Sequence, residues 1–294
     1  MKNVRRDEVV IAGDWHGDAP WAETVVAKAK AANCDVILQV GDFGIWPGRV
    51  GMDFLAEVDV ACFAHEVTIL VTPGNHEDWD AINYMPAIDS SVMPGWGEIK
   101  WFTDNIGVIP RGHRFQISGS DGIPRTFLSL GGAPSIDKDM RTPGVDWWAD
   151  EMITWADVHN VEKAVLKDGP VDYMLTHDAP EPLTRRIAAL IRENGGGWPL
   201  ATIQYCTEGR QRLTAAFNAA RPKVLFHGHY HLRETAQVVG GKYTYDKAGD
   251  RIDLPVQPDN TAQFNCRIES LSMEATSGNA VILDIASGKV KPLF

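Results

Sequence analysis

The sequence predicts an α/β fold with a largely parallel sheet, and three observations support this prediction. Residues 8–12, 35–40 and 67–71 are short, nearly unbroken apolar runs of the kind found in strands buried on both faces. Segments with helical periodicity separate these runs, and each run ends in a polar cluster that contains glycine. Strand–helix–strand alternation at this spacing gives right-handed crossovers, and such sheets bind ligands beyond the carboxyl ends of their strands.

The first half of the chain supplies the helices between these strands. Residues 19–32 are predicted to form a helix, because Pro20 stands near their start and apolar residues recur along one face. Residues 52–65 are predicted to form the next helix, between the second and third apolar runs. A meander of short strands, punctuated by glycine and proline, is expected at 106–109, 114–117 and 126–130.

The second half continues the alternation. A helix at 154–167, closed by Gly169-Pro170, precedes a strand at 172–175. Two helices and a further buried strand are predicted at 183–193, 208–220 and 224–226. Candidate strands at 263–268 and 280–285 could build a second sheet. Because no repeat, low-complexity tract or linker interrupts the chain, we expect one domain over residues 1–294, a two-sheet sandwich with helices outside.

Composition and charge restrict the class of protein. The 294 residues are 44% hydrophobic and 23% charged, which is ordinary for a globular protein with a sizeable core. The net charge of −11 argues against a broad basic face, so a stable nucleic-acid complex is not expected and a small or nucleotide-like substrate is favoured. A phosphate substrate stays possible, since bound cations can reverse the local field of a site.

Cysteine usage and the N-terminus predict a cytoplasmic protein with no membrane partner. The four cysteines are scattered without C-x-x-C spacing, so reduced, buried thiols are favoured over disulfides. The first apolar run is too short for a signal peptide, and no stretch approaches the length of a membrane span.

Polar residues follow five of the predicted strands. Each has an ordinary structural explanation when taken alone: Asp42 could cap a helix, and Asn75 could hold a turn. Together they recur only after apolar strands, at the edge where an α/β sheet gathers its binding site. The residues are Asp14 and His16, Asp42, Asn75 and His76, His177, and His229 and His231.

The donor types in this set predict a dinuclear metal site. Two Asp, one Asn and four of the five His make seven candidate donors, which are too many for one tetrahedral zinc but suit two ions that share a bridging carboxylate. Two ions about 3.5–4 Å apart can clamp the attacking and leaving oxygens of a phosphoryl transfer and lower the pKa of a bound water. No cysteine occupies a ligand position, which argues against structural zinc or an iron–sulfur cluster.

The ordered motifs resemble those of the calcineurin-like metallophosphoesterases. They are Gly-Asp-x-His-Gly, Gly-Asp, Gly-Asn-His-Glu, a His after a strand, and Gly-His-x-His, and they span residues 13–231. The resemblance implies a four-layer αββα sandwich and two divalent metal ions, with Mn²⁺ expected first and Fe, Zn, Ni or Co as alternatives. The implied ligands are Asp14, His16 and His231 for one metal, Asn75, His177 and His229 for the other, and Asp42 as the bridge. His76 would be the catalytic, non-ligand histidine, which donates a proton to the leaving oxygen or stabilises phosphate charge.

The sequence departs from the family pattern at one informative place. Family members that act on phosphoproteins carry Gly-Asp-x-x-Asp-Arg-Gly, in which the second Asp orients the catalytic His and the Arg grips phosphate. Here those two places hold Ile45 and Trp46, so a phosphoprotein substrate is not expected and His76 needs another orienting group. A milder change is His177-Asp178-Ala179-Pro180 in place of His-x-Pro-Pro.

Substrate contacts are predicted beside the metal ligands. Lys138 and Arg141 lie in the loop 131–145 and could meet a substrate phosphate, although a solvated loop explains them equally well. Asn75 and His76 are the other expected substrate contacts.

Several other residues are expected to be structural. Of Trp147 and Trp148, one is expected in the core and the other partly exposed, rather than both stacking on a nucleobase. His227 is expected to support the ligands without being one. Arg185, Arg186, Arg210 and Arg212 are expected on a solvated helix face.

The sequence therefore predicts a metal-dependent phosphoesterase that cleaves phosphomonoesters or phosphodiesters by attack of a metal-bridging hydroxide. A nuclease of the same fold and a non-catalytic metal-binding scaffold are the alternatives. A metallo-β-lactamase is not expected, because His229-x-His231 is followed by Leu232-Arg233 rather than by x-Asp-His. The motifs leave the ester class and the oligomeric state open.

Overall fold

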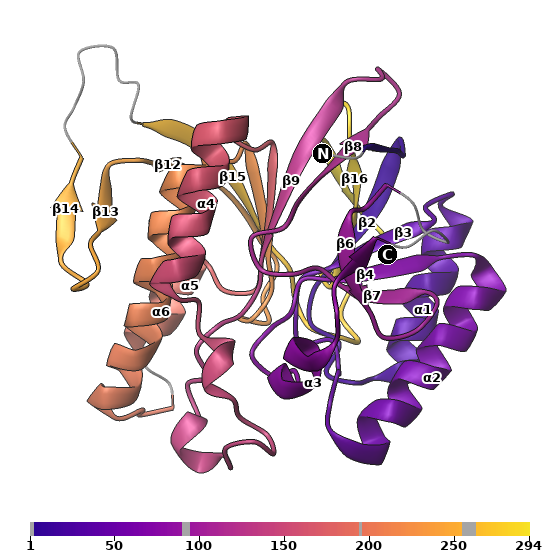
Figure 1. Ribbon diagram of the computed structural model, residues 1–294, viewed down its shortest axis with the longest axis horizontal. Coiled ribbons are helices and arrows are strands. Elements are labelled where there is room, and N and C mark those ends of the chain that lie inside the picture. The colour runs from indigo at the N-terminus through magenta and orange to yellow at the C-terminus, as the bar shows by residue number, and fades with distance from the viewer. Residues whose placement is uncertain (1–2, 90–94, 194–195, 255–262) are drawn as a thin grey trace.

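Two large β-sheets face each other, and helices cover the outer face of each (Figure 1). This arrangement comes from a computed structural model that describes residues 3–89, 95–193, 196–254 and 263–294. The four layers, in order, are helices, sheet, sheet and helices. The predicted αββα sandwich is therefore confirmed.

The first sheet contains eight strands in the order β17-β16-β2-β3-β4-β7-β6-β5. Its four central strands run parallel: β2 (Glu8–Ala12), β3 (Val36–Gln39), β4 (Thr68–Val71) and β7 (Ile106–Val108). Antiparallel strands complete its edges: β16 (Ala280–Asp284), β17 (Val290–Pro292), β6 (Glu98–Trp101) and β5 (Ile88–Asp89). Helices α1 (Ala19–Ala31) and α2 (Gly48–His65) cover its outer face.

The second sheet contains seven strands in the order β1-β8-β9-β10-β11-β15-β12. Its parallel centre is β9 (Pro124–Leu130), β10 (Tyr173–Thr176), β11 (Val224–His227) and β15 (Phe264–Ser270). The outer strands are β1 (Asn3–Arg5), β8 (Arg114–Ser118) and β12 (Glu234–Gly240). Helices α4 (Trp155–Asp168), α5 (Arg185–Glu193) and α6 (Leu200–Ala220) lie on its outer side.

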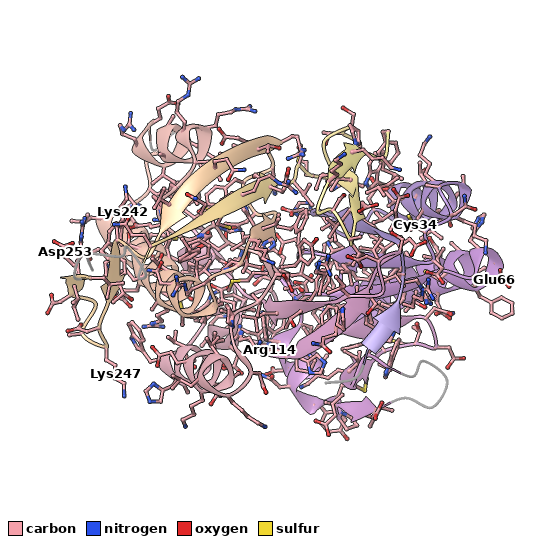
Figure 2. All side chains as sticks on the ribbon, turned by 90° about the horizontal axis from the view of Figure 1, so that it is seen from above. Cys34, Glu66, Arg114, Lys242, Lys247 and Asp253 are labelled. Atoms are coloured by element: carbon pink, nitrogen blue, oxygen red, sulfur yellow. The ribbon has the colours of Figure 1, made fainter. Side chains whose placement is uncertain are left out.

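Smaller elements complete the chain. A short helix α3 (Trp79–Tyr84) follows β4, and a separate hairpin joins β13 (Tyr243–Tyr245) to β14 (Arg251–Asp253). Figure 2 shows the two sides of the molecule: Lys247 and Asp253 of the hairpin lie opposite Glu66 at the end of α2.

Strand β2 explains why the predicted strands have unbroken apolar sequences. Val10 and Ala12 pack against the helices of the first sheet, whereas Val9 and Ile11 pack between the two sheets. Successive side chains of a strand point to opposite faces, so a strand between two apolar layers must be apolar at every position. A third apolar cluster joins the second sheet to α4 and α6.

The structure differs from the predicted elements in one sheet assignment and at several element boundaries. The strand predicted at 280–285 does not join the second sheet: it forms β16, which pairs with β2 in the first sheet, whereas β15 does lie in the second. Helix α2 begins at Gly48 rather than at residue 52, and α6 begins at Leu200 rather than at residue 208. The unpredicted strand β12 lies at a sheet edge and alternates more exposed and less exposed residues, so it carries no continuous apolar run. All four cysteines are free and buried, as predicted. Among the described helices, none combines the length and apolar character that a membrane crossing requires.

Candidate metal centre

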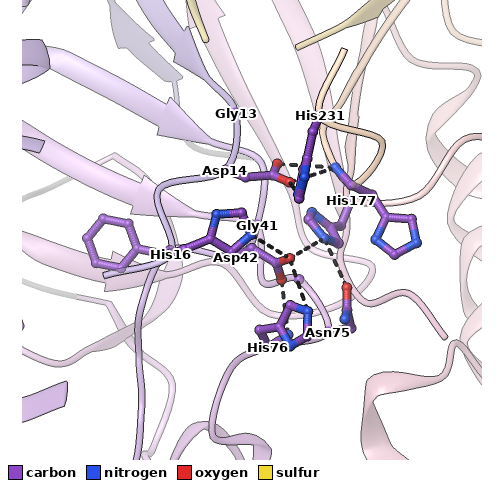
Figure 3. A network of polar contacts seen from close by, with 12 residues as sticks. Gly13, Asp14, His16, Gly41, Asp42, Asn75, His76, His177 and His231 are labelled. Carbon is purple, nitrogen blue, oxygen red and sulfur yellow. Dashed lines mark hydrogen bonds and ion pairs between the residues drawn. The ribbon is translucent and has the colours of Figure 1, made fainter. Parts of the chain in front are cut away.

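The predicted ligand residues meet where the carboxyl ends of both sheets converge (Figure 3). Each of them occupies the loop that directly follows a parallel strand: β2, β3 and β4 of the first sheet, or β10 and β11 of the second. The two sheets therefore share one site. The residues brought together are Asp14, His16, Asp42, Asn75, His76, His177, His229 and His231.

One group of donors consists of Asp14, His16 and His231, whose ligand atoms lie within 4.8 Å of one another. Asp14 is buried, and its Oδ2 lies 3.1 Å from Nε2 of His231. The backbone N–H of His229 donates to both oxygens of Asp14, at 3.1 and 3.0 Å. The carboxylate is therefore held with its charge facing the two imidazoles.

The second group consists of Asp42, His177 and His229, again within 4.8 Å. Nδ1 of the buried His177 lies 2.8 Å from the carbonyl of Val40, and its Nε2 lies 3.2 Å from Oδ2 of Asp42. Oδ1 of Asn75 lies 3.1 Å from the same Nε2. A histidine that donates Nδ1–H to a carbonyl presents Nε2 to a metal, so this orientation suits a ligand.

Asp42 connects the two groups. Its Oδ2 lies 3.2 Å from His177 and 3.6 Å from Nε2 of His16, which belongs to the first group. Burial alone would raise the pKa of Asp42, but electrostatic interaction with the imidazoles of His177 and His76 holds it well below its ordinary value. Asp42 is therefore an ionised carboxylate with an oxygen facing both groups.

The charges of the site fit a pair of cations. Burial opposes protonation of the histidines, yet Asp42 raises the pKa of His177 to about 10 and, with Glu274, that of His16 to about 9. Burial lowers the pKa of His229 to about 4. Without metal, protonated imidazoles thus neutralise the buried carboxylates. A divalent cation can take the place of these protons, and the carboxylate and imidazole donors match the ligand preferences of metals such as Mn²⁺ or Zn²⁺.

Four of these residues hold backbone conformations that are uncommon outside glycine. The φ angles are 41° for His16, 52° for Asp42, 68° for His229 and 52° for His231. Each costs about 1 kcal/mol or more and persists only where surrounding contacts impose it. The close packing of these loops is evident at Gly228, which precedes His229. A Cβ atom on residue 228 would lie 1.9 Å from Oδ1 of Asp14. Only glycine permits the carboxylate and this backbone to approach so closely.

His76 lies beside the donors with Arg141 as its neighbour. Its backbone N–H donates to Oδ1 of Asp42 at 3.0 Å, and its ring Nε2 lies 3.5 Å from the Arg141 guanidinium. Asp137 accepts two hydrogen bonds from Arg141, at 2.8 and 2.7 Å, which fix the guanidinium. Burial lowers the pKa of His76. At the position of the missing Asp, Ile45 is buried and its side chain offers no hydrogen bond. Arg141, at 3.5 Å, and Asp42, at 3.9 Å, are polar side chains close to Nε2 of the ring.

The two predicted phosphate contacts differ in position. Arg141 lines a pocket together with His16 and His76. Lys138 is not among the described residues that line this pocket; its ammonium donates to Asp139 at 2.6 Å and lies over the ring of Tyr205. Its role in binding substrate stays a prediction.

Two residues of the C-terminal segment support the donor residues and were not predicted from the sequence. Oε2 of Glu274 lies 2.7 Å from Nδ1 of His16. The buried amide of Asn279 donates to the backbone carbonyl of Asp14 at 3.0 Å and accepts from the indoles of Trp15 and Trp21. Neither residue has a motif, and more than 200 positions separate each from its partner, so no local pattern could have identified them.

A buried relay supports Asn75 from the second sheet. Nδ2 of Asn75 donates to Oγ of Ser135 at 2.9 Å, and this hydroxyl donates to Glu151 at 2.6 Å. Glu151 is buried and also accepts from Tyr205 and from the Trp147 indole. Because Nδ2 is used by the hydroxyl, Oδ1 of Asn75 is left facing His177.

Glu77 joins the loops that carry Asp42 and Asn75. It is buried, and its carboxylate accepts from the backbone N–H groups of Phe43, at 2.6 Å, and Gly74. Burial and the nearby Asp42 raise its pKa to about 7. Glu77 is the last residue of the Gly-Asn-His-Glu motif, and this was the sequence feature that could have indicated its role.

Three expectations on neighbouring residues have clear outcomes. Arg210 is buried beside Asp178, because α6 packs this face against the site loops. The prediction that Arg210 lies on a solvated helix face was therefore wrong. Trp148 is in the core and Trp147 is partly exposed, as predicted. His227 is buried next to the predicted ligands, with Nδ1 close to the Gly228 carbonyl.

The sequence of residues 8–233 matches the profile of the calcineurin-like phosphoesterases. The chain belongs to this family. Its members are dinuclear, metal-dependent and act on phosphate esters, in agreement with the two donor groups described above. Glu274 and Asn279 lie beyond the matched residues.

Solved structures show the same fold at low sequence identity. Protein TT1561 of Thermus thermophilus is 13% identical, with a TM-score of 0.52 and 97% of each chain covered. A dimetal phosphatase from Danio rerio is 11% identical, with a TM-score of 0.51. The match covers 97% of this chain and 95% of the other. No curated protein matches the sequence.

Proposed function

We propose that this protein is a dinuclear metallophosphoesterase that hydrolyses a small or nucleotide-like phosphomonoester or phosphodiester. The observation that carries the proposal is the placement of Asp42, whose Oδ2 lies 3.2 Å from His177 of one donor group and 3.6 Å from His16 of the other. A carboxylate in this position suits a bridge between two cations.

The proposed ligands follow the two groups. Asp14, His16 and His231 would hold one ion, Asn75, His177 and His229 would hold the other, and Asp42 would contact both. Manganese is the proposed native metal. When bound, the two ions would supply positive charge for the phosphate and lower the pKa of a water molecule towards neutrality.

His76 and Arg141 would act on the substrate. Arg141, fixed by Asp137, offers a rigid guanidinium that offsets phosphate charge. Burial lowers the pKa of His76, so its ring is neutral at rest, and an incoming dianion would favour its protonation. The protonated ring could then give its proton to the leaving oxygen. Asn75 is a further proposed phosphate contact, and Lys138 a more distant one.

The direct test is hydrolysis of an aryl phosphate monoester and of the corresponding diester, before and after removal of metal by a chelator. Activity should vanish with the chelator and return when Mn²⁺ is added. Turnover that persists without metal would refute the mechanism. A panel of nucleotides, cyclic nucleotides, phosphopeptides and single-stranded DNA under one metal condition then separates a small-ester hydrolase from a nuclease.

A further inference from the structure

A pocket of about 440 Å³ adjoins the donor groups and combines two chemistries. His16, His76 and Arg141 contribute its polar part. Its apolar part comes from two separate segments: Trp46, Pro47 and Val50 around the start of α2, and Val145 and Trp148 from the loop after β9. The pocket volume lies within the range of small-molecule sites.

Part of the apolar lining of the pocket is open to solvent. The side chains of Val50 and Val145 are 65% and 57% exposed, although they come from different segments and line the same pocket. Exposed aliphatic groups that line one concave surface next to a reactive centre are typical of a ligand contact rather than of a solvated loop.

Trp46 occupies a fixed place in this pocket. Its ring packs closely against Gly17: a Cβ atom added to Gly17 would lie 2.7 Å from the ring. Gly17 follows His16 in the loop after β2, so the indole is packed against a loop that carries a donor. A rigid indole offers a flat apolar surface that favours aromatic partners.

The charged residues of the pocket favour phosphate binding in one part of it only, beside Arg141. Among the described residues that line the pocket, Arg141 is the sole Lys or Arg, and Asp146 is the sole carboxylate. One oxygen of Asp146, Oδ1, accepts from the backbone N–H of Thr142 at 2.6 Å, and the negative charge of this residue disfavours phosphate beside it. The remaining lining has little to offer a polar or charged organic group.

We infer that this pocket binds the organic group of the substrate ester and that this group is apolar and aromatic. The inference rests on the proposed phosphoesterase function. The phosphate lies at His76 and Arg141, and the organic group lies against Trp46, Val50 and Val145. Water adds to phosphorus as the P–O bond to the organic group breaks, and the leaving oxygen takes up a proton, which releases an alcohol.

The test compares esters whose leaving groups are primary alcohols of similar basicity, so that intrinsic reactivity does not decide the outcome. Benzyl, butyl and glycerol phosphates, each as the monoester and as the methyl diester, are assayed with Mn²⁺ by release of phosphate or alcohol. We expect kcat/KM to fall in the order benzyl, butyl, glycerol, with about tenfold or more between the first and the last.

Variants locate the preference in the pocket. Val50→Ser and Val145→Ser change exposed side chains and should not disturb folding; each should reduce the benzyl-to-glycerol ratio several-fold, and Trp46→Ala should reduce it further. Phe63→Ser is the matched control, because Phe63 is an exposed apolar residue of α2 that does not line the pocket. It should leave the ratio unchanged.

Binding of non-hydrolysable esters gives a second readout that does not require turnover. Calorimetry should show benzylphosphonate binding about tenfold more tightly than 2-hydroxyethylphosphonate, with the difference reduced by Val145→Ser. Metal-dependent turnover with equal rates for benzyl and glycerol esters would overturn this inference and leave the proposed function intact. Absence of metal-dependent turnover on every ester would instead refute the proposed function.

Discussion

The two donor groups differ in their access to solvent. In the first group, the side chains of His231 and His16 are 41% and 24% exposed, whereas His177 and Asp42 of the second group are buried. Asp14 of the first group is buried and His229 of the second is half-buried, so the difference in access lies mainly in His16 and His231. We expect an ion in the buried group to bind more tightly and to exchange more slowly.

The two groups also differ in what supports them. The exposed group depends on Glu274, which contacts His16 from the C-terminal segment. The buried group depends on Ser135 and Glu151, which hold Asn75 through a chain of hydrogen bonds. We therefore expect the two groups to hold their ions with different strength, each adjusted by its own neighbours.

The largest expected effect is that of Asp42→Ala, because this substitution removes the carboxylate that faces both groups. Both ions should be lost, and kcat should fall by about 10³-fold or more, the scale of removing a central electrostatic group. Metal analysis of the purified protein and the rate with Mn²⁺ check this. Asp53→Ala, an exposed change on α2, is the control. Retention of two ions by Asp42→Ala would disprove the bridging role.

His76→Ala should separate catalysis from metal binding. The ring lies 3.9 Å from Asp42 and is not part of either donor group, so both ions should stay. We expect kcat to fall by about 10²-fold, as for the loss of a general acid. An unchanged rate would show that the role assigned to His76 is wrong.

The affinity for metal should rise with pH. In the metal-free protein the pKa of His16 is raised to about 9 and that of His177 to about 10, so a cation must displace a proton from each. Proton competition weakens as pH rises towards those values, so the apparent affinity should increase by about tenfold per pH unit for each proton displaced. His229, with a pKa of about 4, is already deprotonated and adds nothing between pH 6 and 8. Calorimetric titrations with Mn²⁺ at pH 6 and 8 measure the slope; a pH-independent affinity would contradict it.

The smallest effects come from the matched pair Glu274→Gln and Ser135→Ala. Each removes a group that touches a donor residue without being a donor itself, and such changes weaken metal affinity by about tenfold. Glu274→Gln should weaken the exposed group only, and Ser135→Ala the buried group only. If either variant weakened both ions equally, the two groups would not be supported independently.

The sequence was sufficient to predict the parallel strands and the residues that end them. Buried strands such as β2 must be apolar on both faces, and the polar residues after them have few other uses. The positive φ angles of His16 and His231 could not be predicted, since they arise from tertiary contacts. The same holds for Glu274, which meets His16 only because β16 pairs with β2 and brings the C-terminal segment to the site.

The most direct test is a titration of the metal-free protein with Mn²⁺, followed by crystallography with anomalous scattering at each stage of loading. We expect two ions per chain. The first should bind among Asp42, Asn75, His177 and His229. The second should bind beside Asp14, His16 and His231. A single ion at saturation, or a first ion in the exposed group, would contradict this expectation.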